Sequence, residues 1–319
     1  MSLHQSRRAV LCVLVMTCLT LIAMPVLAQG KGEPDPPGRI GVPFGGDGTP
    51  ADTFGHVIVD NGSGMCASSF VDISATGTPV TYTASGTFPA EDDGGAAVTL
   101  AQPINFYGAM VSDIVISSNG YVAMGTPGGL GDEDGGDFSE DCPLPAIPGN
   151  TVFTDSRIMP FHNDLAGDAT GGITYTEYFA SCPRPSEAGD EDCTVIMWDD
   201  WSLFFETDVF EINAILYHQS GLVVYQYNDP TGLLDPTTAA IAMQNAGATD
   251  AATYSCAAPA TIDGNAICIF DPACVEPGCL GGGFGEDPFD VNIPTASTVG
   301  LAILAALLGF AGLMLVRRR

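Results

Sequence analysis

The stretch EINAILYHQSGLVVYQY, residues 211–227, decides the fold, because apolar and polar residues alternate on both sides of a short turn. Successive side chains of a β-strand point to opposite faces, so every second residue shares a face. We therefore expect two antiparallel strands joined around residues 218–221, with one face in a core and the other more polar or covered. The expected core face carries Ile212, Ala214, Leu216, Val223, Tyr225 and Tyr227, and the opposite face carries Glu211, Asn213, Val224 and Gln226.

The strand pattern continues over most of the chain. Between residues 29 and 292 no segment keeps an apolar repeat of 3.6 residues, whereas short runs rich in Val, Ile, Thr, Tyr and Phe alternate with Gly, Pro, Asn and Asp. The sequence Ser118-Asn119-Gly120 lies between two such runs and predicts a tight type I′ hairpin turn. We expect strands at 57–59, 80–84, 98–100, 114–117, 121–124, 158–161, 173–179, 193–198, 209–217, 223–227 and 239–244. The predicted fold class is all-β, a disulfide-stapled antiparallel β-sandwich ectodomain.

The cysteines indicate an oxidising compartment. Of ten cysteines, Cys12 and Cys18 lie in the N-terminal apolar stretch, and the remaining even number is typical of disulfides in an exported chain. The expected disulfide cysteines are Cys66, Cys142, Cys182, Cys193, Cys256, Cys268, Cys274 and Cys279. Nearness in sequence favours the pairs 182–193, 256–268 and 274–279, which leaves 66–142. A zinc site is the alternative, but the spacings offer no CxxC pair and no histidine partners.

The N-terminus has the features of a secretory signal peptide. Arg7 and Arg8 form a basic region, an apolar stretch follows from residue 9 to 23, and Val26-Leu27-Ala28 fits a small-residue cleavage site. We expect cleavage after Ala28. The alternative is an N-terminal anchor that is not cleaved.

The segment IPTASTVGLAILAALLGFAGLMLVRRR, residues 293–319, combines a short polar motif, an apolar run and three arginines. From Val299 through Leu308 to Val316, 18 residues carry no charge. At the rise of an α-helix they would span ~27 Å, close to the thickness of the hydrocarbon core of a bilayer. We expect a membrane anchor here. Its flanking residues Arg317, Arg318 and Arg319 would stay on the cytoplasmic side, with the rest of the protein outside.

The order of these C-terminal features resembles the IPTL-CTERM class of sorting signals. The motif is Ile293, Pro294 and Thr295, followed by a Ser/Thr-rich turn, an apolar helix and terminal arginines. Ala296 stands where leucine is usual in that class. The resemblance implies an exosortase-type processing enzyme as a partner, in bacteria with complex envelopes. A permanent single-pass tail anchor is the alternative.

The central part of the chain, about 98 to 256, resembles a β-rich module loosely similar to nidogen-type extracellular domains. The motifs that carry this resemblance, in order along the chain, are INFYG at 104–108, IVISSNGY at 114–121, RIMPF at 157–161, GITY at 172–175, CTVIMW at 193–198, the hairpin 211–227 and IAMQNA at 241–246. The resemblance implies an extracellular interaction or matrix role. It carries over no catalytic residues.

The charge of the chain excludes some partners. With 38 acidic and 9 basic residues, the formal net charge is −29. Such a protein repels nucleic acids and anionic lipids, so we expect no nucleic-acid partner. The acidic loop 131–137, with Asp132, Asp134 and Asp137, is the best candidate for binding Ca²⁺, since hard carboxylate oxygens on a flexible loop suit that ion. The alternative is a solvated acidic loop. Residues 162–164 are a second, weaker candidate.

No sequence motif indicates an enzyme. GxSxG, HExxH and a phosphate-binding Gly-Lys-Ser/Thr pattern are all absent from the sequence, and His56, His162 and His218 are its histidines beyond the signal peptide. We expect Trp198, Trp201, Phe204, Phe205 and Phe210 to form the core and rim of the sheets, with an exposed carbohydrate-binding platform as the alternative. A hydrolase whose site is assembled from distant residues is a further alternative.

The predicted organisation is a signal peptide at 1–28, a Gly/Pro-rich linker at 29–56, a β-sandwich at 57–277, a Gly/Asp-rich tether at 278–292, and the sorting motif and membrane helix at 293–319. We predict an exported protein of the bacterial cell envelope or extracellular matrix, whose precursor is held in the inner membrane. Its module would bind a glycan or a surface protein without catalysis. The alternatives are a calcium-dependent, lectin-like glycan binder and a secreted hydrolase.

Overall fold

The computed structural model describes residues 51–63, 66–125, 135–140, 142–145, 156–184, 190–230, 232–262 and 264–271. All of them belong to the larger of two compact units, Asp35–Arg319. The predicted signal peptide, tether and sorting segment lie outside the described residues, as does most of the predicted linker. Among the residues that are described, no helix is long and apolar enough to cross a membrane.

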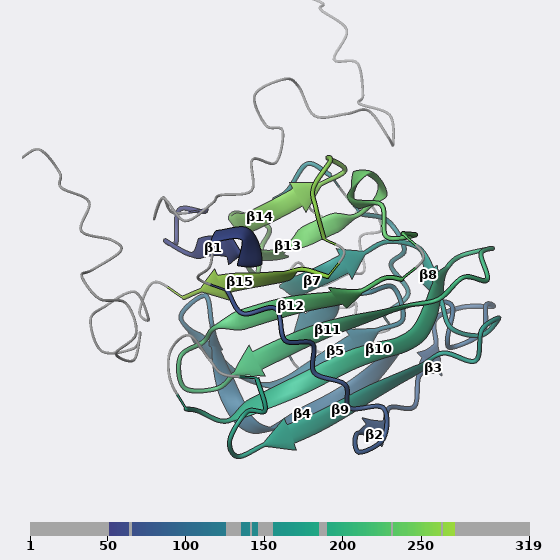
Figure 1. Ribbon diagram of the computed structural model, residues 1–319, viewed down its shortest axis with the longest axis horizontal. Helices are drawn as coiled ribbons and strands as arrows, with labels where there is room; N and C mark the ends of the chain where they lie inside the picture. The colour runs from purple at the N-terminus through teal and green to yellow at the C-terminus, as the bar shows by residue number, and fades with distance from the viewer. Residues whose placement is uncertain are drawn as a thin grey trace, which may run out of the picture. The chain divides into compact units, whose positions relative to one another are not determined.

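The described residues form two antiparallel β-sheets, which confirms the β-rich class (Figure 1). The first sheet has the order β1-β15-β12-β11-β10-β9-β2, with β8 paired to β10. Its strands are β1 (Val57–Asp60), β2 (Thr78–Pro79), β8 (Leu165–Ala166), β9 (Ile173–Phe179), β10 (Cys193–Leu203), β11 (Phe210–Tyr217), β12 (Val223–Asn228) and β15 (Ala266–Phe270). Two short 3₁₀ helices, η1 (Asn61–Ser63) and η2 (Pro236–Thr238), lie in connections between strands.

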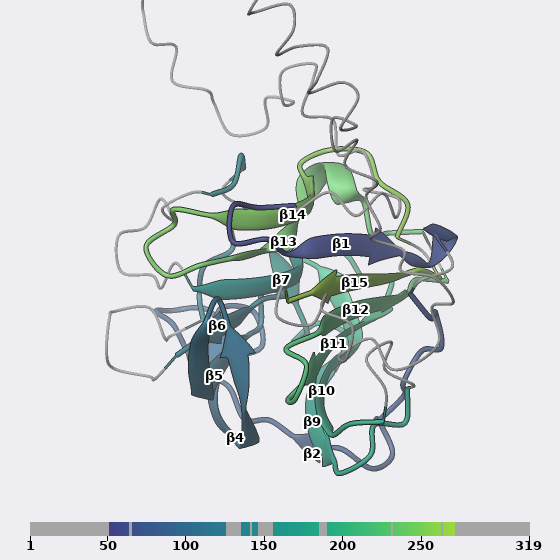
Figure 2. The same cartoon turned by 90° about the vertical axis from the view of Figure 1, so that its left-hand side faces the viewer.

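The second sheet has the order β14-β13-β7-β6-β5-β4-β3. Its strands are β3 (Thr83–Ala84), β4 (Gly94–Phe106), β5 (Ala109–Ser117), β6 (Val122–Met124), β7 (Arg157–His162), β13 (Ala240–Gln244) and β14 (Ala251–Cys256). Figure 2 shows β4, β5 and β6 on one side and β9 to β12 on the other, as two layers. The sequence pattern predicted most of these strands but not β2, β8, β14 or β15, and of the expected strand at 80–84 only Thr83 and Ala84 lie in a strand, β3.

The main core lies between the two sheets. Ile212, Ala214, Leu216, Val223, Tyr225 and Tyr227, the side chains expected to share a core face, are all buried there. The Tyr225 hydroxyl donates to the Ala242 carbonyl at 2.7 Å and the Tyr227 hydroxyl to the Pro160 carbonyl at 2.6 Å. Because these bonds cross from one sheet to the other, they satisfy the buried hydroxyls and also set the position of the two layers.

A second core covers the outer face of the first sheet, on the side that the sequence predicted to be polar or covered. Residues 66–77, here called the strap, cross β12, β11 and β10 between β1 and β2 (Figure 1). The Asn213 side-chain amide donates to the Val71 carbonyl at 2.8 Å, and the Val71 amide donates to Gln226 Oε1 at 3.1 Å. Asn213 and Gln226 on this face therefore bind the backbone of the strap rather than solvent.

The hairpin around Ser118-Asn119-Gly120 is confirmed, but its turn type is not. β5 pairs with β6, and the Ser117 amide donates to the Tyr121 carbonyl at 2.9 Å, which leaves a loop of three residues. Gly120 has φ of 70°, whereas Asn119 is not among the residues with positive φ. A type I′ turn needs positive φ at both central residues, so that interpretation was wrong. The loop is also fully buried rather than at the surface.

The disulfides confirm one predicted pair and correct two. Cys182 bonds to Cys193, as expected for the two ends of a hairpin. Cys66 bonds to Cys268 and Cys142 to Cys256, across sequence separations of 202 and 114 residues. Nearness in sequence failed as a guide because β1 pairs with β15, which brings the chain after β1 beside Cys268. Cys274 and Cys279 lie outside the described residues.

Candidate functional site

The best candidate for a binding site is a groove at one edge of the sandwich, where β9 of the first sheet faces β4 of the second. It consists of two hollows, of about 440 Å³ and about 380 Å³, that share Tyr178 as a lining residue. We call it the edge groove. Its described lining is Thr76, Thr78, Val98, Thr99, Leu100, Ala101, Gln102, Pro103, Thr176, Glu177, Tyr178, Ala180, Asp192, Thr194, His218 and Gln219.

The strand pairing explains why the groove is open. On its outer side β9 pairs with β2 only at Tyr175 and Thr176. On the matching side of the other sheet, β3 covers β4 only at Gly94 and Gly95. Farther along both strands, no strand within the described residues continues either sheet. The pairing of β4 with β5 is also irregular between Thr99 and Ile104, and this irregular part carries Gln102 and Pro103 into the wall of the groove.

Tyr178 stands at the centre of the groove with its hydroxyl held in place. Its side chain is 39% exposed, and its hydroxyl donates to Asp192 Oδ2 at 3.1 Å. The Gln219 side-chain amide donates to the other carboxylate oxygen of Asp192 at 3.2 Å. Asp192 therefore fixes both a ring and an amide, and the geometry of the groove is set before any ligand binds.

The far wall of the groove is the tip of the β11–β12 hairpin, and Glu191 fixes it. The Glu191 carboxylate accepts the backbone amides of Gln219 at 3.1 Å and Ser220 at 2.9 Å, and the Ser220 hydroxyl at 2.7 Å. His218 lies in the same tip, where its Nε2 is 2.9 Å from the buried Thr194 hydroxyl. Burial lowers the pKa of His218, so its ring is neutral at neutral pH.

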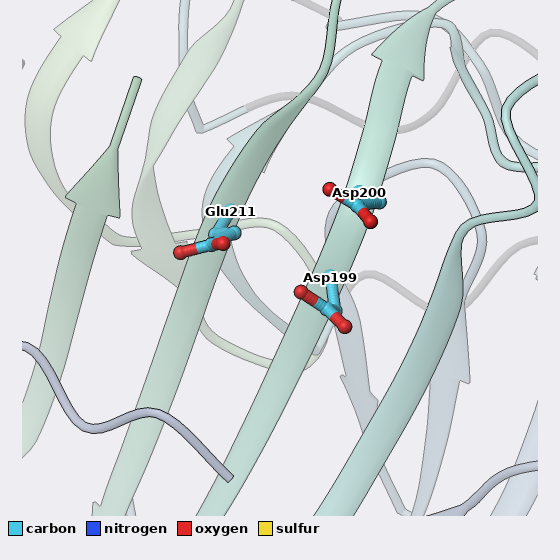
Figure 3. A group of neighbouring side chains, drawn as sticks. All are labelled: Asp199, Asp200 and Glu211. Carbon is cyan, nitrogen blue, oxygen red and sulfur yellow. The ribbon is translucent and has the colours of Figure 1, made fainter. Parts of the chain in front are cut away.

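Three carboxylates on the first sheet form a second cluster, away from the groove lining. Figure 3 shows Asp199 and Asp200 on β10 and Glu211 on the neighbouring strand β11. One oxygen of each lies within 4.8 Å of the others. A register shift between Trp198 and Trp201 brings Asp199 and Asp200 together. Burial and then the negative charges of Asp200 and Glu211 raise the pKa of Asp199 to about 6. Oxygen ligands at this spacing could hold a divalent cation such as Ca²⁺.

The acidic loop expected to bind calcium is described only in part. Asp132 and Asp134 lie outside the described residues. Asp137 is buried, and its Oδ2 accepts from Arg157 Nη1 at 2.7 Å. Burial by itself would raise the pKa of Asp137, but His162 and Arg157 hold it below its usual value. In this structure the carboxylate of Asp137 is therefore engaged with an internal arginine.

The remaining histidines serve packing. His56 Nδ1 lies 2.6 Å from Asp52 Oδ2, which also accepts the Tyr107 hydroxyl at 2.9 Å. This cluster attaches residues 51–56, the end of the predicted linker, to the turn after β4. His162 Nε2 bonds the carbonyl of Asp137 at 3.1 Å, and burial lowers the His162 pKa to about 4.

The aromatic side chains divide as predicted between core and rim. Trp198 and Trp201, the two tryptophans of the chain, are fully buried, as is Phe210. Phe205 is 89% exposed and lies 3.9 Å, centroid to centroid, from Phe204. An aligned platform of exposed tryptophans is therefore excluded.

Sequence reasoning missed both the edge groove and the Asp199 cluster. The only local signal was the pair Asp199-Asp200 interrupting an apolar strand, because a register shift often lies where alternation breaks. The model of the family described as NIDO related matches residues 65–272. This range contains both sheets except β1, and it includes the 98–256 region that resembles nidogen-type modules. No curated protein and no solved structure matches the chain.

Proposed function

Because the chain belongs to the NIDO-related family, we propose that it works outside the cytoplasm as a non-catalytic interaction module of the bacterial cell envelope or extracellular matrix. The observation that carries this proposal is the family match together with three disulfides, which persist in oxidising compartments. The edge groove is the surface through which the module would bind its partner. A preorganised groove in which polar groups surround a partly exposed aromatic ring suits binding.

We further propose that the signal at 1–28 exports the chain and that residues 293–319 sort it. In this proposal the apolar helix from Val299 to Val316 holds the precursor in the inner membrane, and an exosortase-type enzyme cuts near Ile293-Pro294-Thr295. The order of motif, apolar run and terminal arginines supports it.

The intact mass of the protein, recovered from envelope and medium fractions with and without reduction, tests both steps. We expect a product that lacks residues 1–28 and the segment after Thr295, and that gains two hydrogens for each disulfide reduced. A product in the membrane fraction that still ends at Arg319 would contradict sorting and leave a tethered surface domain. A product found reduced in the cytoplasm would contradict export.

The Asp199 cluster favours a second candidate function, calcium-dependent binding. We expect Ca²⁺ titrated calorimetrically into the purified ectodomain to release or absorb heat in the wild type, and Asp199→Asn to abolish most of that heat. Asp208→Asn removes an exposed carboxylate outside the cluster and is the matched control. If the Asp132→Asn/Asp134→Asn double variant loses binding instead, the acidic loop is the calcium site. If the wild type shows no heat, the function is calcium-independent.

A further inference from the structure

We propose that the edge groove binds an oligosaccharide that is uncharged or carries amino groups, with the Tyr178 ring as its stacking surface. This inference rests on the proposed interaction function and names the ligand class of the same site. Three features of the groove support it: the ring, the polar groups around the ring, and the charge.

The ring of Tyr178 is placed to stack against a sugar. Tyr178 lines both hollows, so a ligand that extends from one into the other contacts this residue. The hydroxyl bond to Asp192 and the tilted contact with the His218 ring, 5.9 Å between centroids, restrict its rotation. A partly exposed aromatic ring that cannot rotate offers contact area at low entropic cost. The apolar face of a pyranose ring is the chemical group that fits such a surface.

The polar groups around the ring match sugar hydroxyls. Thr78, Thr99 and Thr176 line one hollow, where the Thr99 hydroxyl donates to Asp113 Oδ1 at 2.7 Å, and Gln102, Gln219 and Asp192 line the other. Hydroxyls and side-chain amides donate and accept hydrogen bonds, which suits ligands whose hydroxyls also do both. Both hollows fall within the range of roughly 300–1,000 Å³ that small-molecule sites occupy.

The charge of the site excludes acidic sugars. Asp192 and Glu177 line the groove, and no lysine or arginine does so among its described lining residues. Arg157 and Arg184, the only residues of those two types in the described part of the chain, are both buried. A uronic acid in the groove would meet like charge without a compensating cation, whereas a neutral or protonated amino sugar would not.

An extended peptide added to the edge of β4 is the competing occupant, and the structure disfavours it. Strand addition requires a regular row of backbone donors and acceptors. Within the groove, β4 is irregular between Thr99 and Ile104, and Pro103 has no amide hydrogen to donate. Irregularities and prolines of this kind are features by which sheets prevent strand addition.

The test uses the disulfide-intact ectodomain and titration calorimetry with four tetrasaccharides: cellotetraose, the N-acetylglucosamine tetramer, the glucosamine tetramer and tetragalacturonate. An array of neutral glycans extends the search to other linkages. We expect binding of at least one neutral or amino oligosaccharide and none of tetragalacturonate. Tyr178→Ala should weaken that binding about ten-fold, the equivalent of losing one aromatic stacking contact. Tyr178→Phe, which keeps the ring, should weaken it by about three-fold or less.

Phe205→Ala is the matched control, because it removes the most exposed large apolar side chain that the described residues have outside the groove. Circular dichroism of each variant separates loss of folding from loss of binding. The proposal is overturned if no neutral or amino glycan binds the folded protein, if Phe205→Ala weakens binding and Tyr178→Ala does not, or if a peptide library binds at the β4 edge instead. None of these results would contradict the proposed export and interaction role. That role is tested separately by the mass and location of the native protein.

Discussion

Replacing Gly120 by alanine tests how tightly the buried loop after β5 is packed. Gly120 has φ of 70°, and a Cβ atom there would overlap the carbonyl oxygen of Phe161 and lie 2.8 Å from Leu165 Cδ1. Gly171 has nearly the same φ, 77°, but a Cβ there would meet nothing within 4 Å. The two glycines therefore share a backbone conformation and differ in their surroundings, which makes Gly171→Ala a matched control.

The expected magnitudes follow from that difference. Placing alanine in the left-handed region costs about 1–2 kcal/mol, and Gly171→Ala should lose only this amount. In Gly120→Ala the overlapping backbone must also shift. That shift breaks the bond from the Phe161 amide to the Gly120 carbonyl, 3.2 Å, and the bond from the Leu165 amide to Asn119 Oδ1, 3.0 Å. Each is worth about 1 kcal/mol net, so with disrupted packing the total loss reaches about 4 kcal/mol or more.

Urea unfolding with the disulfides intact measures both variants, and the fluorescence of the two buried tryptophans reports the transition. We expect Gly120→Ala to lower the free energy of unfolding by at least about 2 kcal/mol more than Gly171→Ala does. If the two variants lose the same free energy of unfolding within about 0.5 kcal/mol, the reasoning is refuted, because the loop would then accommodate a Cβ atom at Gly120 without a clash.

The other predictions concern pH, the strap and a disulfide. Burial lowers the pKa of His162 from 6.5 to about 4. As the pH falls from 6.5 to about 4, the His162 ring is therefore protonated in the unfolded state but not in the folded state. The free energy of unfolding should fall by up to about 3 kcal/mol over this range. His162→Gln should remove that part of the pH slope, and an unchanged slope would assign it to other groups. Asn213→Ala leaves the Val71 carbonyl of the strap without its 2.8 Å bond and should lower the free energy of unfolding in urea by about 2 kcal/mol. A loss under about 0.5 kcal/mol would mean that packing and the bonds to Gln226 hold the strap without Asn213. The Cys182→Ala/Cys193→Ala double variant opens the short disulfide loop, whose ends are 11 residues apart in sequence. Its free energy of unfolding should fall by about 3 kcal/mol, which is measured as a lower denaturation midpoint. An unchanged midpoint would mean that the hairpin is fully formed without the covalent bond.

Local alternation was enough to predict most of the strands and the faces of the 211–227 hairpin. The side chain of every second residue points the same way in any β-strand, so the core face of Ile212, Ala214 and Leu216 can be assigned without knowing its neighbours. The same logic predicted that the opposite face is more polar or covered, and it could neither decide between these two nor identify the cover. The strap that covers it is irregular, and its bonds to Asn213 and Gln226 join residues more than a hundred positions apart.

Three of the missed strands, β2, β8 and β15, pair with strands distant in sequence, whereas β14 pairs with β13, which directly precedes it. β15 pairs with β1 and β12, and this pairing decides that Cys268 meets Cys66 rather than Cys256. Similarly, the Asn-Gly pair at 119–120 predicted a type I′ turn because such pairs readily take its positive φ angles. Here the contacts of the loop with the segments after β7 bury it, so tertiary packing replaced the usual turn type with a three-residue loop.

The sequence by itself determined the all-β class, the core face of the central hairpin, the Cys182–Cys193 disulfide and the resemblance to nidogen-type modules, because each depends on residues close together in the chain or on their order. Only the tertiary structure decided the other two disulfides, the strap and the edge groove. Tyr178 lies in β9 and Asp192 directly precedes the neighbouring strand β10, but Gln102 and Gln219 line the same hollow from β4 and from the β11–β12 turn. A site whose members are far apart in sequence has no local pattern, since its geometry exists only after the two sheets have packed.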